Sequence, residues 1–303
     1  MAEIRFDNRV AIVTGAGGGL GRSHALLLAS RGAKVVVNDL GGSVDGSGAS
    51  SKAADKVVDE IKAAGGQAVA NYDGVDTMEG AQKIVATAKD AFGKLDIVIN
   101  NAGILRDVSF VKMTEDDWNK VLQVHLSGSM FVTKAAWGLL RDNNYGRVVF
   151  TTSAAGLYGN FGQANYSAAK LGTVGLAKTL SHEGAKYNIK CNVIAPIAKS
   201  RMTETIMPPD VLNKLLPEYV SPLVAYLASE GLEETAQVYA VGGGYVSRVA
   251  VMEAEGTYLD PSKGVTIEQL AERWKQVNDM SKARAFNNAM EAAGQAMKAV
   301  MGG

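Results

Sequence analysis

Residues 10–21 read Val10-Ala11-Ile12-Val13-Thr14-Gly15-Ala16-Gly17-Gly18-Gly19-Leu20-Gly21, and a helical pattern follows over residues 22–30. The first four residues are typical of a strand that is buried on both faces. Glycines let the backbone turn sharply and approach a pyrophosphate, whose charge is met by N–H groups at a helix N-terminus. The stretch predicts a strand, a turn and a helix that bind a dinucleotide. Because a glycine pattern alone is weak evidence, a tight structural turn is the alternative.

Short apolar runs of this kind recur along the chain and alternate with helical patterns. They are Val10 to Val13, Lys34 to Asn38, Ala68 to Ala70, Ile97 to Ile99, Val148 to Thr151, Lys190 to Ile194 and Val238 to Val241. Such alternation is typical of a parallel sheet with connecting helices on both faces. We expect an α/β fold with a doubly wound, Rossmann-type parallel sheet of seven strands, whose ligand crevice lies beyond the carboxyl ends of the strands.

One connecting helix is expected over residues 52–64 and ends at a pair of glycines. Its buried stripe is predicted to contain Ala53, Val57, Ile61 and Ala64. The loop before it, residues 41–48, is long and rich in turn-forming residues. We expect this loop either to become ordered around a cofactor or to be a plain surface insertion.

The sheet pattern ends after Val241-Gly242-Gly243-Gly244, which divides the chain into two parts. We expect residues 1–247 to form a nucleotide-binding catalytic domain. Residues 248–303 would form a helical extension, with helices near residues 267–278 and 282–301. The last helix is rich in methionine, so it could pack on the domain, contact a second subunit, or lead to a further domain.

Composition and charge argue against several classes of function. With 31 basic and 31 acidic residues, the chain has no basic field for nucleic acid or an anionic membrane surface. No apolar run reaches transmembrane length, and the acidic start is unlike a secretory signal. The single Cys191 lies in an apolar strand pattern, so we expect no intrachain disulfide. The three histidines, His24, His125 and His182, are too scattered for a metal site.

Asp39 follows the second expected strand at the spacing of an acid that binds ribose hydroxyls. It would repel a 2′-phosphate, and no Arg or Lys lies at residues 40–42 or between Gly15 and Gly21 to neutralise one. We therefore predict NAD rather than NADP, with an ordinary turn-capping role of Asp39 as the alternative. A nucleoside-triphosphate loop is disfavoured, because Gly21 is followed by Arg22 rather than by Lys.

Tyr166 and Lys170 lie four residues apart in a helical pattern, so both side chains share one face. Ser153 lies upstream, just after the fifth expected strand, where it would face the same crevice. Proton removal from an alcohol needs a base, and lysine together with an oxidised nicotinamide would lower the tyrosine pKa from about 10. We predict Tyr166 as the base, with Ser153 donating to the substrate oxygen. The plain alternatives are a solvated lysine and a strand-end cap.

These motifs resemble those of the short-chain dehydrogenase/reductase family. The resemblance covers residues 5–245 and rests on Thr14 to Gly21, Asn100-Asn101-Ala102-Gly103, Ser153, Tyr166 and Lys170. Other segments are similar to the (3R)-hydroxyacyl-CoA dehydrogenase units of type 2 peroxisomal multifunctional enzymes. These segments are Asn38 to Gly42, Gly103 to Asp107, Gly159 to Tyr166 and Ser200 to Thr205, followed in the tail by Gly256 to Tyr258 and Asp260-Pro261.

The resemblance implies cofactor-binding roles for a set of residues. Those expected at the pyrophosphate are Gly15, Gly19, Leu20 and Gly21. Those expected along the rest of the cofactor are Asp39 at the adenosine ribose, Asp73 at the adenine, Asn101, Ala102, Gly103 and Thr203, with Tyr166 and Lys170 at the nicotinamide end.

His125 occupies a position at which many members of the family carry Asn. We expect it to join the catalytic residues as part of a proton relay, since an imidazole can donate and accept; a satisfied core histidine is the alternative. Ala195-Pro196-Ile197 also departs from the Pro-Gly often found there. Residues 198–217 would cover the acyl chain, with Met202, Met207 and Leu212 as apolar contacts. Lys199 and Arg201 would meet CoA phosphates or stay solvated.

By this resemblance we expect NAD-dependent oxidation of a (3R)-hydroxyacyl-CoA to the 3-ketoacyl-CoA in fatty-acid β-oxidation. The alternatives are a 3-ketoacyl-carrier-protein reductase, a hydroxysteroid dehydrogenase, or a non-catalytic NAD-binding scaffold. The resemblance also implies a homodimer, formed through helices near residues 116–140 and 165–186, and a hydratase domain in a longer chain. The sequence carries no terminal Ser-Lys-Leu signal, so the expected peroxisomal location follows from the resemblance alone.

Overall fold

An eight-stranded sheet forms the centre of the first of two units in the computed structural model, which describes residues 3–43, 45–48, 50–198 and 208–302. The first unit is Met1–Arg248 and the second is Val249–Gly303. The strands are β1 (Val10–Thr14), β2 (Lys34–Asn38), β3 (Gln67–Asn71), β4 (Ile97–Asn100), β5 (Gly146–Thr151), β6 (Ile189–Pro196), β7 (Val238–Gly242) and β8 (Tyr245–Val249). Their order is β3-β2-β1-β4-β5-β6-β7-β8, and β1 to β7 pair in parallel. The order reverses between β1 and β4, which is where such folds bind ligands.

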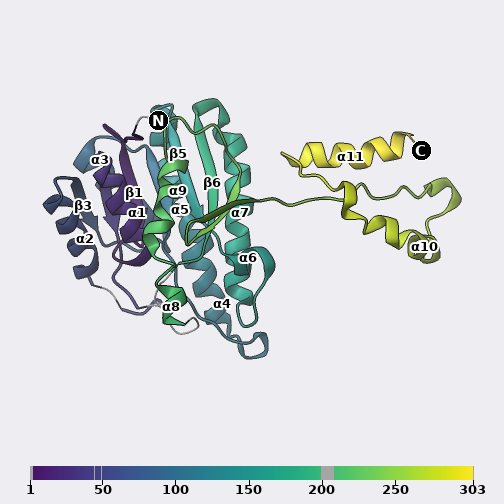
Figure 1. Cartoon of the computed structure of the whole chain (residues 1–303), viewed down its shortest axis with the longest axis horizontal. Coiled ribbons are helices and arrows are strands. Elements are labelled where there is room, and N and C mark those ends of the chain that lie inside the picture. Colours follow the sequence, from purple (N-terminus) through teal and green to yellow (C-terminus); the bar gives the residue numbers. More distant parts are fainter. Residues whose placement is uncertain (1–2, 44, 49, 199–207, 303) are drawn as a thin grey trace. The chain divides into compact units, whose positions relative to one another are not determined.

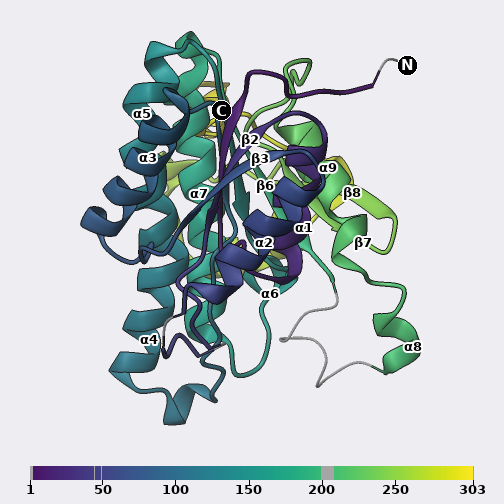
Figure 2. The same cartoon turned by 90° about the vertical axis from the view of Figure 1, so that its left-hand side faces the viewer.

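Helices cover both faces of the sheet, as predicted (Figures 1 and 2). On one face lie α1 (Gly19–Ser30), α2 (Lys52–Ala63) and α9 (Ser221–Leu227). On the other lie α3 (Met78–Phe92), α5 (Gly128–Asp142) and α7 (Ala164–Gly184). Three further helices stand at or near the carboxyl end of the sheet: α4 (Glu115–Leu122), α6 (Ala154–Tyr158) and α8 (Pro209–Leu212).

The seven predicted strands are confirmed, and Cys191 is buried in β6 as expected. The predicted end of the sheet after Gly244 is wrong, because β8 adds an eighth strand beside β7. Gly243 and Gly244 both have positive φ, 57° and 85°, as the two central residues of a hairpin turn require. A two-residue connection joins antiparallel neighbours, so this glycine pair turns the chain back along the sheet edge.

The buried face of α2 also differs from the prediction. It contains Ala54, Val57, Val58 and Ile61, while Ala53 is only partly buried and Ala64 is exposed beyond the helix end. The observed spacing is i, i+3, i+4 and i+7, a broader stripe than a single row of every fourth residue. Two adjacent rows of small and β-branched side chains therefore contact the sheet.

The second unit contains α10 (Ile267–Val277) and α11 (Ala289–Gly302). The position of α10 confirms the prediction, and its start is fixed by a capping box between Thr266 and Gln269. The second helix begins at Ala289 instead of near residue 282, because the Asn288 side chain accepts from the Glu291 N–H and so caps the helix there. Across the described residues, no helix combines the length and apolarity needed to cross a membrane.

Candidate active site

The turn between β1 and α1 depends on glycine at two close approaches. Gly15 has φ of 64°, and a Cβ there would lie 2.8 Å from the Cα of Ala102. A Cβ at Gly21 would lie 2.2 Å from the carbonyl oxygen of Gly15. Glycine at both positions lets the turn fold against the loop after β4. Leu20, in the first turn of α1, is partly buried and packs against the hydrophobic core.

The N-terminus of α1 has the properties of an anion site. Gly18, at the N-cap, provides no side-chain cap, and no acidic residue lies in the first turn. A Cβ built at Gly18 or Gly19 would meet no atom of the described residues within 4 Å, so these residues leave the space in front of the helix open. The first N–H groups of this helix therefore lack side-chain partners and fit a pyrophosphate.

Asn101 joins the glycine turn to the end of β4. Its side-chain amide donates to the carbonyl oxygens of Thr14 at 3.0 Å and Gly15 at 3.1 Å, and its backbone N–H donates to Thr14 Oγ1 at 3.0 Å. The backbone N–H of Ala102 donates to the same hydroxyl at 3.1 Å. Asn101 and Ala102 thus hold the two ligand-facing loops together at the reversal of strand order.

Asp39 lies at the end of β2 and faces the glycine turn. Its two carboxylate oxygens accept from the backbone N–H of Gly17 at 2.7 Å and of Gly41 at 2.6 Å. Each oxygen retains further acceptor capacity for a ribose hydroxyl. Asp73 lies farther along the sheet edge, where its carboxylate accepts from the side chain of Asn71 at 2.9 Å.

Tyr166, Lys170 and Ser153 come together at the carboxyl ends of β4 and β5. Lys170 is buried, its Nζ donates to the carbonyl oxygen of Thr151 at 2.7 Å, and it lies 5.6 Å from the centre of the Tyr166 ring. Ser153 is the N-cap of α6, where its hydroxyl accepts from the N–H of Ala155 at 3.2 Å. The Ser153 hydroxyl can therefore cap α6 and form a hydrogen bond with Tyr166 at the same time.

Burial is the largest influence on the pKa values of Tyr166 and Lys170. It raises the pKa of Tyr166 to about 12, although a hydrogen bond with Ser153 lowers the pKa and the charge of Asp107 raises it further. Burial also lowers the pKa of Lys170 to about 7. The chain's own groups thus do not produce the lowered tyrosine pKa that the sequence analysis expected, because loss of hydration opposes both charged forms.

His125 lies in a π-helical turn, Gln123–Ser127, between α4 and α5. It is 2% exposed, and its Nε2 lies 2.7 Å from the carbonyl oxygen of Ile104. The imidazole meets Tyr166 edge to face, with ring centres 5.1 Å apart. Its Nδ1 is buried and has no hydrogen-bond partner in the part of the chain that the structure describes. A Cβ at Gly103 would lie 2.3 Å from the imidazole Cε1, so glycine there is required by this contact.

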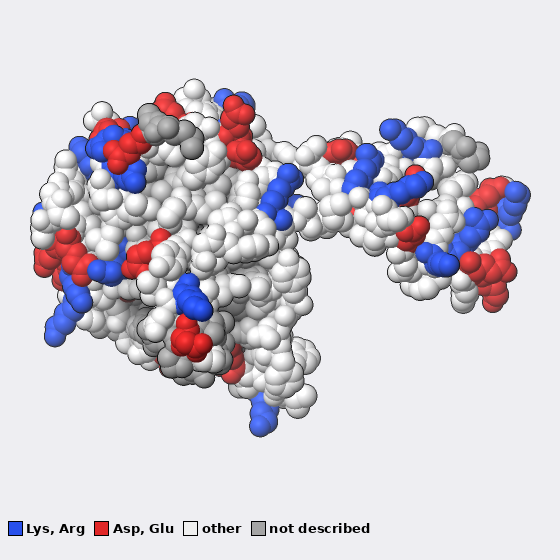
Figure 3. Space-filling view, in the orientation of Figure 1, with Lys and Arg blue, Asp and Glu red and all other residues white. Residues whose placement is uncertain are grey.

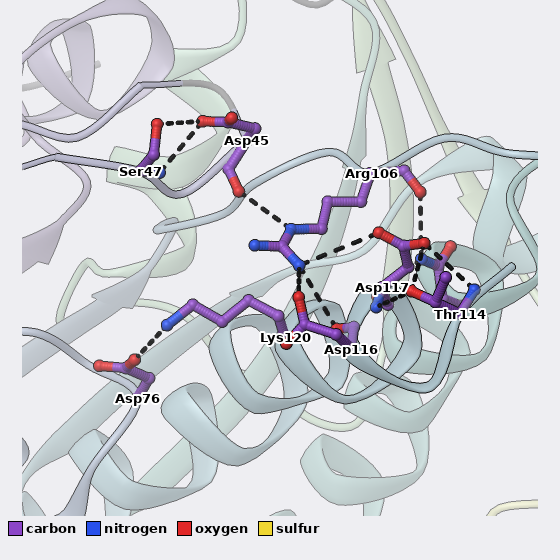
Figure 4. Close-up of polar contacts among 9 residues, drawn as sticks. Asp45, Ser47, Asp76, Arg106, Thr114, Asp116, Asp117 and Lys120 are labelled. Carbon is purple, nitrogen blue, oxygen red and sulfur yellow. Dashed lines mark hydrogen bonds and ion pairs between the residues drawn. The ribbon is translucent and has the colours of Figure 1, made fainter.

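A polar network that the sequence analysis missed ties three loops together at this end of the sheet (Figure 4). Arg106, after β4, donates to the backbone oxygen of Asp45 in the loop after β2 and pairs with Asp116 on α4. Lys120 on α4 pairs with Asp76, after β3, at 2.9 Å. The sequence could not predict these pairs, because their residues lie in distant segments of the chain and belong to no local motif.

Asp107 and Asn165 were also missed as site residues. Asp107 accepts from the Gln163 side chain at 2.7 Å, and burial raises its pKa. Asn165 is fully buried and donates to the carbonyl oxygens of Arg106 and Asp117 at 3.2 and 3.0 Å. It thereby fixes the start of α7, one residue before Tyr166.

Several predicted residues lie outside the described part of the chain: Lys199, Arg201, Met202, Thr203 and Met207. Leu212 is described and is buried in α8. Within the described residues, no group of three or more His, Cys, Asp or Glu side chains is placed to hold a metal ion.

Comparison with known proteins links this site to one family. The short chain dehydrogenase family pattern matches residues 9–209. Peroxisomal multifunctional enzyme A of Dictyostelium discoideum is 53% identical over 297 residues, which are 98% of this chain and 66% of that protein. The structure of full-length peroxisomal multifunctional enzyme type 2 from Drosophila melanogaster matches with a TM-score of 0.84 at 43% identity, over 98% of this chain and 50% of that chain.

A more distant structure matches with its cofactor bound. It is a 7α-hydroxysteroid dehydrogenase in complex with NADH and 7-oxo glycochenodeoxycholic acid, with a TM-score of 0.71 at 27% identity, over 79% of this chain and 95% of that chain. The open N-terminus of α1 and the glycine turn fit a nicotinamide dinucleotide as the cofactor. The chain spans 66% and 50% of the two multifunctional enzymes, so the activity of those whole proteins extends beyond it.

Proposed function

This chain belongs to the short-chain dehydrogenase family, and we propose that it oxidises (3R)-hydroxyacyl-CoA to 3-ketoacyl-CoA with NAD⁺ as the acceptor. The observation that carries the proposal is the burial of Lys170 beside Tyr166, which also forms a hydrogen bond with Ser153. The glycine turn after β1 lies at the same, carboxyl end of the sheet. The names of the multifunctional relatives support the substrate class.

In the proposed reaction Tyr166 accepts the proton of the substrate hydroxyl, and Ser153 donates a hydrogen bond to the same oxygen. Bound oxidised nicotinamide supplies the hydride acceptor and a positive charge. Lys170 is held by the Thr151 carbonyl below the Tyr166 ring, where its charged form would favour the tyrosinate. The bonds of Asn165 to the carbonyl oxygens of Arg106 and Asp117 fix the first turn of α7, which carries Tyr166.

We assign the dinucleotide as NAD because of Asp39. Its carboxylate lies between the N–H groups of Gly17 and Gly41, beside the entrance of the cradle. A 2′-phosphate at this place would meet a negative charge, whereas a ribose hydroxyl would donate to it. Gly15, Gly19, Leu20 and Gly21 would surround the pyrophosphate, and Ala102 and Gly103 would form the adjacent wall.

His125 is proposed as a proton-relay residue behind the base. Nε2 lies 2.7 Å from the Ile104 carbonyl oxygen and 3.1 Å from the Ile104 backbone nitrogen. In the tautomer that donates to this carbonyl, Nδ1 is a buried acceptor on a ring that contacts Tyr166. Burial and the Lys170 charge hold the pKa of His125 well below 6.5, so the ring is neutral. We expect His125→Ala to lower kcat and change the pH profile; an unchanged rate and profile would remove the relay.

The longer relatives suggest a wider setting for this activity. We propose that the chain acts as a homodimer, beside a hydratase domain of a longer protein, in the peroxisome. Sedimentation velocity of this chain measures the first of these proposals directly, and a monomer at micromolar concentration would contradict it.

The function is tested by NADH absorbance with purified protein, (3R)- and (3S)-hydroxyacyl-CoA, and NAD⁺ or NADP⁺. Turnover restricted to the 3R form with NAD⁺ is expected. An Asp39→Arg variant should shift the preference towards NADP⁺, with Asp90→Arg on the outer face of α3 as the matched charge control. Turnover of a hydroxysteroid or an acyl-carrier-protein thioester in place of acyl-CoA would contradict the substrate, and NAD binding without any turnover would indicate a scaffold.

A further inference from the structure

The four most exposed large apolar side chains described in the first unit lie in two short segments. Phe110 and Val111 are 76% and 95% exposed, and Tyr158 and Phe161 are 74% and 90% exposed. The next value among the described residues of this unit is 64%, for Tyr245. A concentration of exposed apolar surface is informative where single exposed residues are not. We name these four residues the apolar lip.

The two segments of the apolar lip are bonded to each other. The N–H of Val108 donates to the carbonyl oxygen of Gly162 at 2.9 Å, and the Gln163 side chain donates to Asp107 at 2.7 Å. Phe161 precedes Gly162, and Phe110 is two residues beyond Val108, a reach of about 7 Å along an extended chain. The two segments are therefore carried on neighbouring backbone.

The apolar lip is continuous with the candidate catalytic residues. Ser153 caps α6, whose last residue is Tyr158. Phe161 lies five residues before Tyr166, and Asn165 between them donates to the carbonyl oxygen of Arg106. A substrate chain that extends from a carbon held at Ser153 and Tyr166 would thus run toward the apolar lip, which begins at the far end of α6.

The composition of the lip favours an aliphatic occupant. Residues 158–162 contain no charged side chain, and residues 108–113 contain only Lys112. Figure 3 shows few charges on the surface over α6 and the loop before α4. Gly159 and Gly162 have φ of 78° and 77°, conformations that glycine adopts without strain and that present Phe161 between them. The four side chains of the lip carry no charge, and the phenol of Tyr158 is their one polar group, so the lip fits an aliphatic chain better than a charged partner.

We propose that the apolar lip binds the aliphatic chain of the substrate and sets its chain-length preference. This inference rests on the proposed function and adds the specificity-determining residues Phe110, Val111 and Phe161. Each methylene that the lip covers changes affinity by roughly four-fold, from about 0.8 kcal/mol of buried methylene. Long-chain substrates therefore gain from the lip, whereas the four-carbon substrate is too short to reach it.

The test compares Phe110→Ser/Phe161→Ser with the parent chain on (3R)-hydroxybutyryl-CoA and (3R)-hydroxydodecanoyl-CoA. Loss of two or three methylene contacts should raise KM for the dodecanoyl substrate about 15- to 60-fold. KM for the butyryl substrate and kcat for both should change less than about two-fold. Val111→Ser is a second variant that removes an almost fully exposed side chain, and Ile4→Ser, exposed before β1 at the opposite end of the sheet, is the matched control.

The outcomes separate this inference from the function on which it rests. An equal loss on both substrates, or an unchanged KM for the dodecanoyl substrate, overturns the lip while leaving the dehydrogenase activity in place. A change of association state in sedimentation velocity, together with lost activity on both substrates, would make the lip an interface between copies. Absence of turnover with every hydroxyacyl-CoA in the parent chain overturns both proposals.

Discussion

The two ends of the sheet both bury charged and polar side chains, but among the described residues only the amino end provides hydrogen-bond partners for all of them. At the amino end, Arg147 is 1% exposed and donates to four carbonyl oxygens, those of Gly146, Asn188, Ser229 and Glu230. The ring of Tyr145 lies between the guanidinium groups of Arg9 and Arg147, at 3.6 and 4.2 Å. Asp96, fully buried, pairs with Arg9 and Lys94. Each ion there has its partners.

At the carboxyl end, four buried side-chain atoms have no hydrogen-bond partner among the described residues. These atoms are Asn100 Oδ1, His125 Nδ1, Thr151 Oγ1 and Ser167 Oγ; a fifth such atom, His24 Nε2, lies within α1. Lys170, at the same end of the sheet, is 4% exposed and donates to the carbonyl oxygen of Thr151. An unsatisfied buried group costs about 1–3 kcal/mol, so natural chains retain such groups where a ligand or a reaction uses them. The amino end therefore serves stability, and the carboxyl end gives up stability for chemistry.

The sharpest way to break this comparison is a pair of tyrosine variants. Tyr166→Phe removes the proposed base and should lower kcat about 10³-fold or more, while the unfolding free energy stays within about 0.5 kcal/mol. Tyr145→Phe removes a hydroxyl that donates to the Ala228 carbonyl at 3.1 Å, and should cost about 1 kcal/mol with kcat retained. NADH absorbance and urea unfolding measure both. Equal effects of the two variants on kcat would contradict the assignment of catalysis to the carboxyl end and of stability to the amino end.

Two buried cations form the next pair. Arg147→Met leaves several carbonyl oxygens without their donor and should lower the unfolding free energy by about 3 kcal/mol, with NADH formation preserved in the folded fraction. Lys170→Met removes a cation that burial already disfavours. Its unfolding free energy should therefore fall by no more than about 1 kcal/mol, while kcat falls about 10²-fold. A larger destabilisation by Lys170→Met than by Arg147→Met would reverse the assignment of the two ends.

Sequence could predict the local part of this arrangement and not the rest. The glycine turn and the Tyr166/Lys170 spacing are readable because each lies within one strand-turn-helix or one helix. The four acceptors of Arg147 come from residues up to 83 positions away, so its burial has no local signature. The position of His125, whose Nδ1 has no partner among the described residues, depends on a π-helical turn that no sequence pattern predicts. The glycine pair before β8 could equally end a sheet in a loop, so the sequence does not reveal the hairpin. Non-local pairing decides all three.

Because the pKa of Lys170 is lowered, the stability of the protein should depend on pH. Its pKa is about 7 in the folded chain against 10.5 for the free side chain, so the unfolded state binds more protons between these values. The unfolding free energy should therefore rise with pH in this window, with a slope of at most about 1.4 kcal/mol per pH unit. Lys170→Met should flatten the slope, measured by urea unfolding from pH 7 to 10. The Arg147→Met variant should keep it, and a parallel loss in both would point to a different titrating group.

The smallest effect concerns Asp107, whose charge raises the pKa of Tyr166. Asp107→Asn keeps an oxygen that can accept from Gln163 and removes the negative charge that opposes the tyrosinate. The rising alkaline limb of kcat/KM should then move to lower pH by a few tenths of a unit, since kcat/KM reports ionisations of the free enzyme. The exposed Asp90 on α3 provides the control, and Asp90→Asn should leave the limb in place. A shift of this limb to higher pH would contradict the prediction. It would mean that Asp107 acts on Tyr166 through hydrogen bonds that Asn cannot replace, and not through its negative charge.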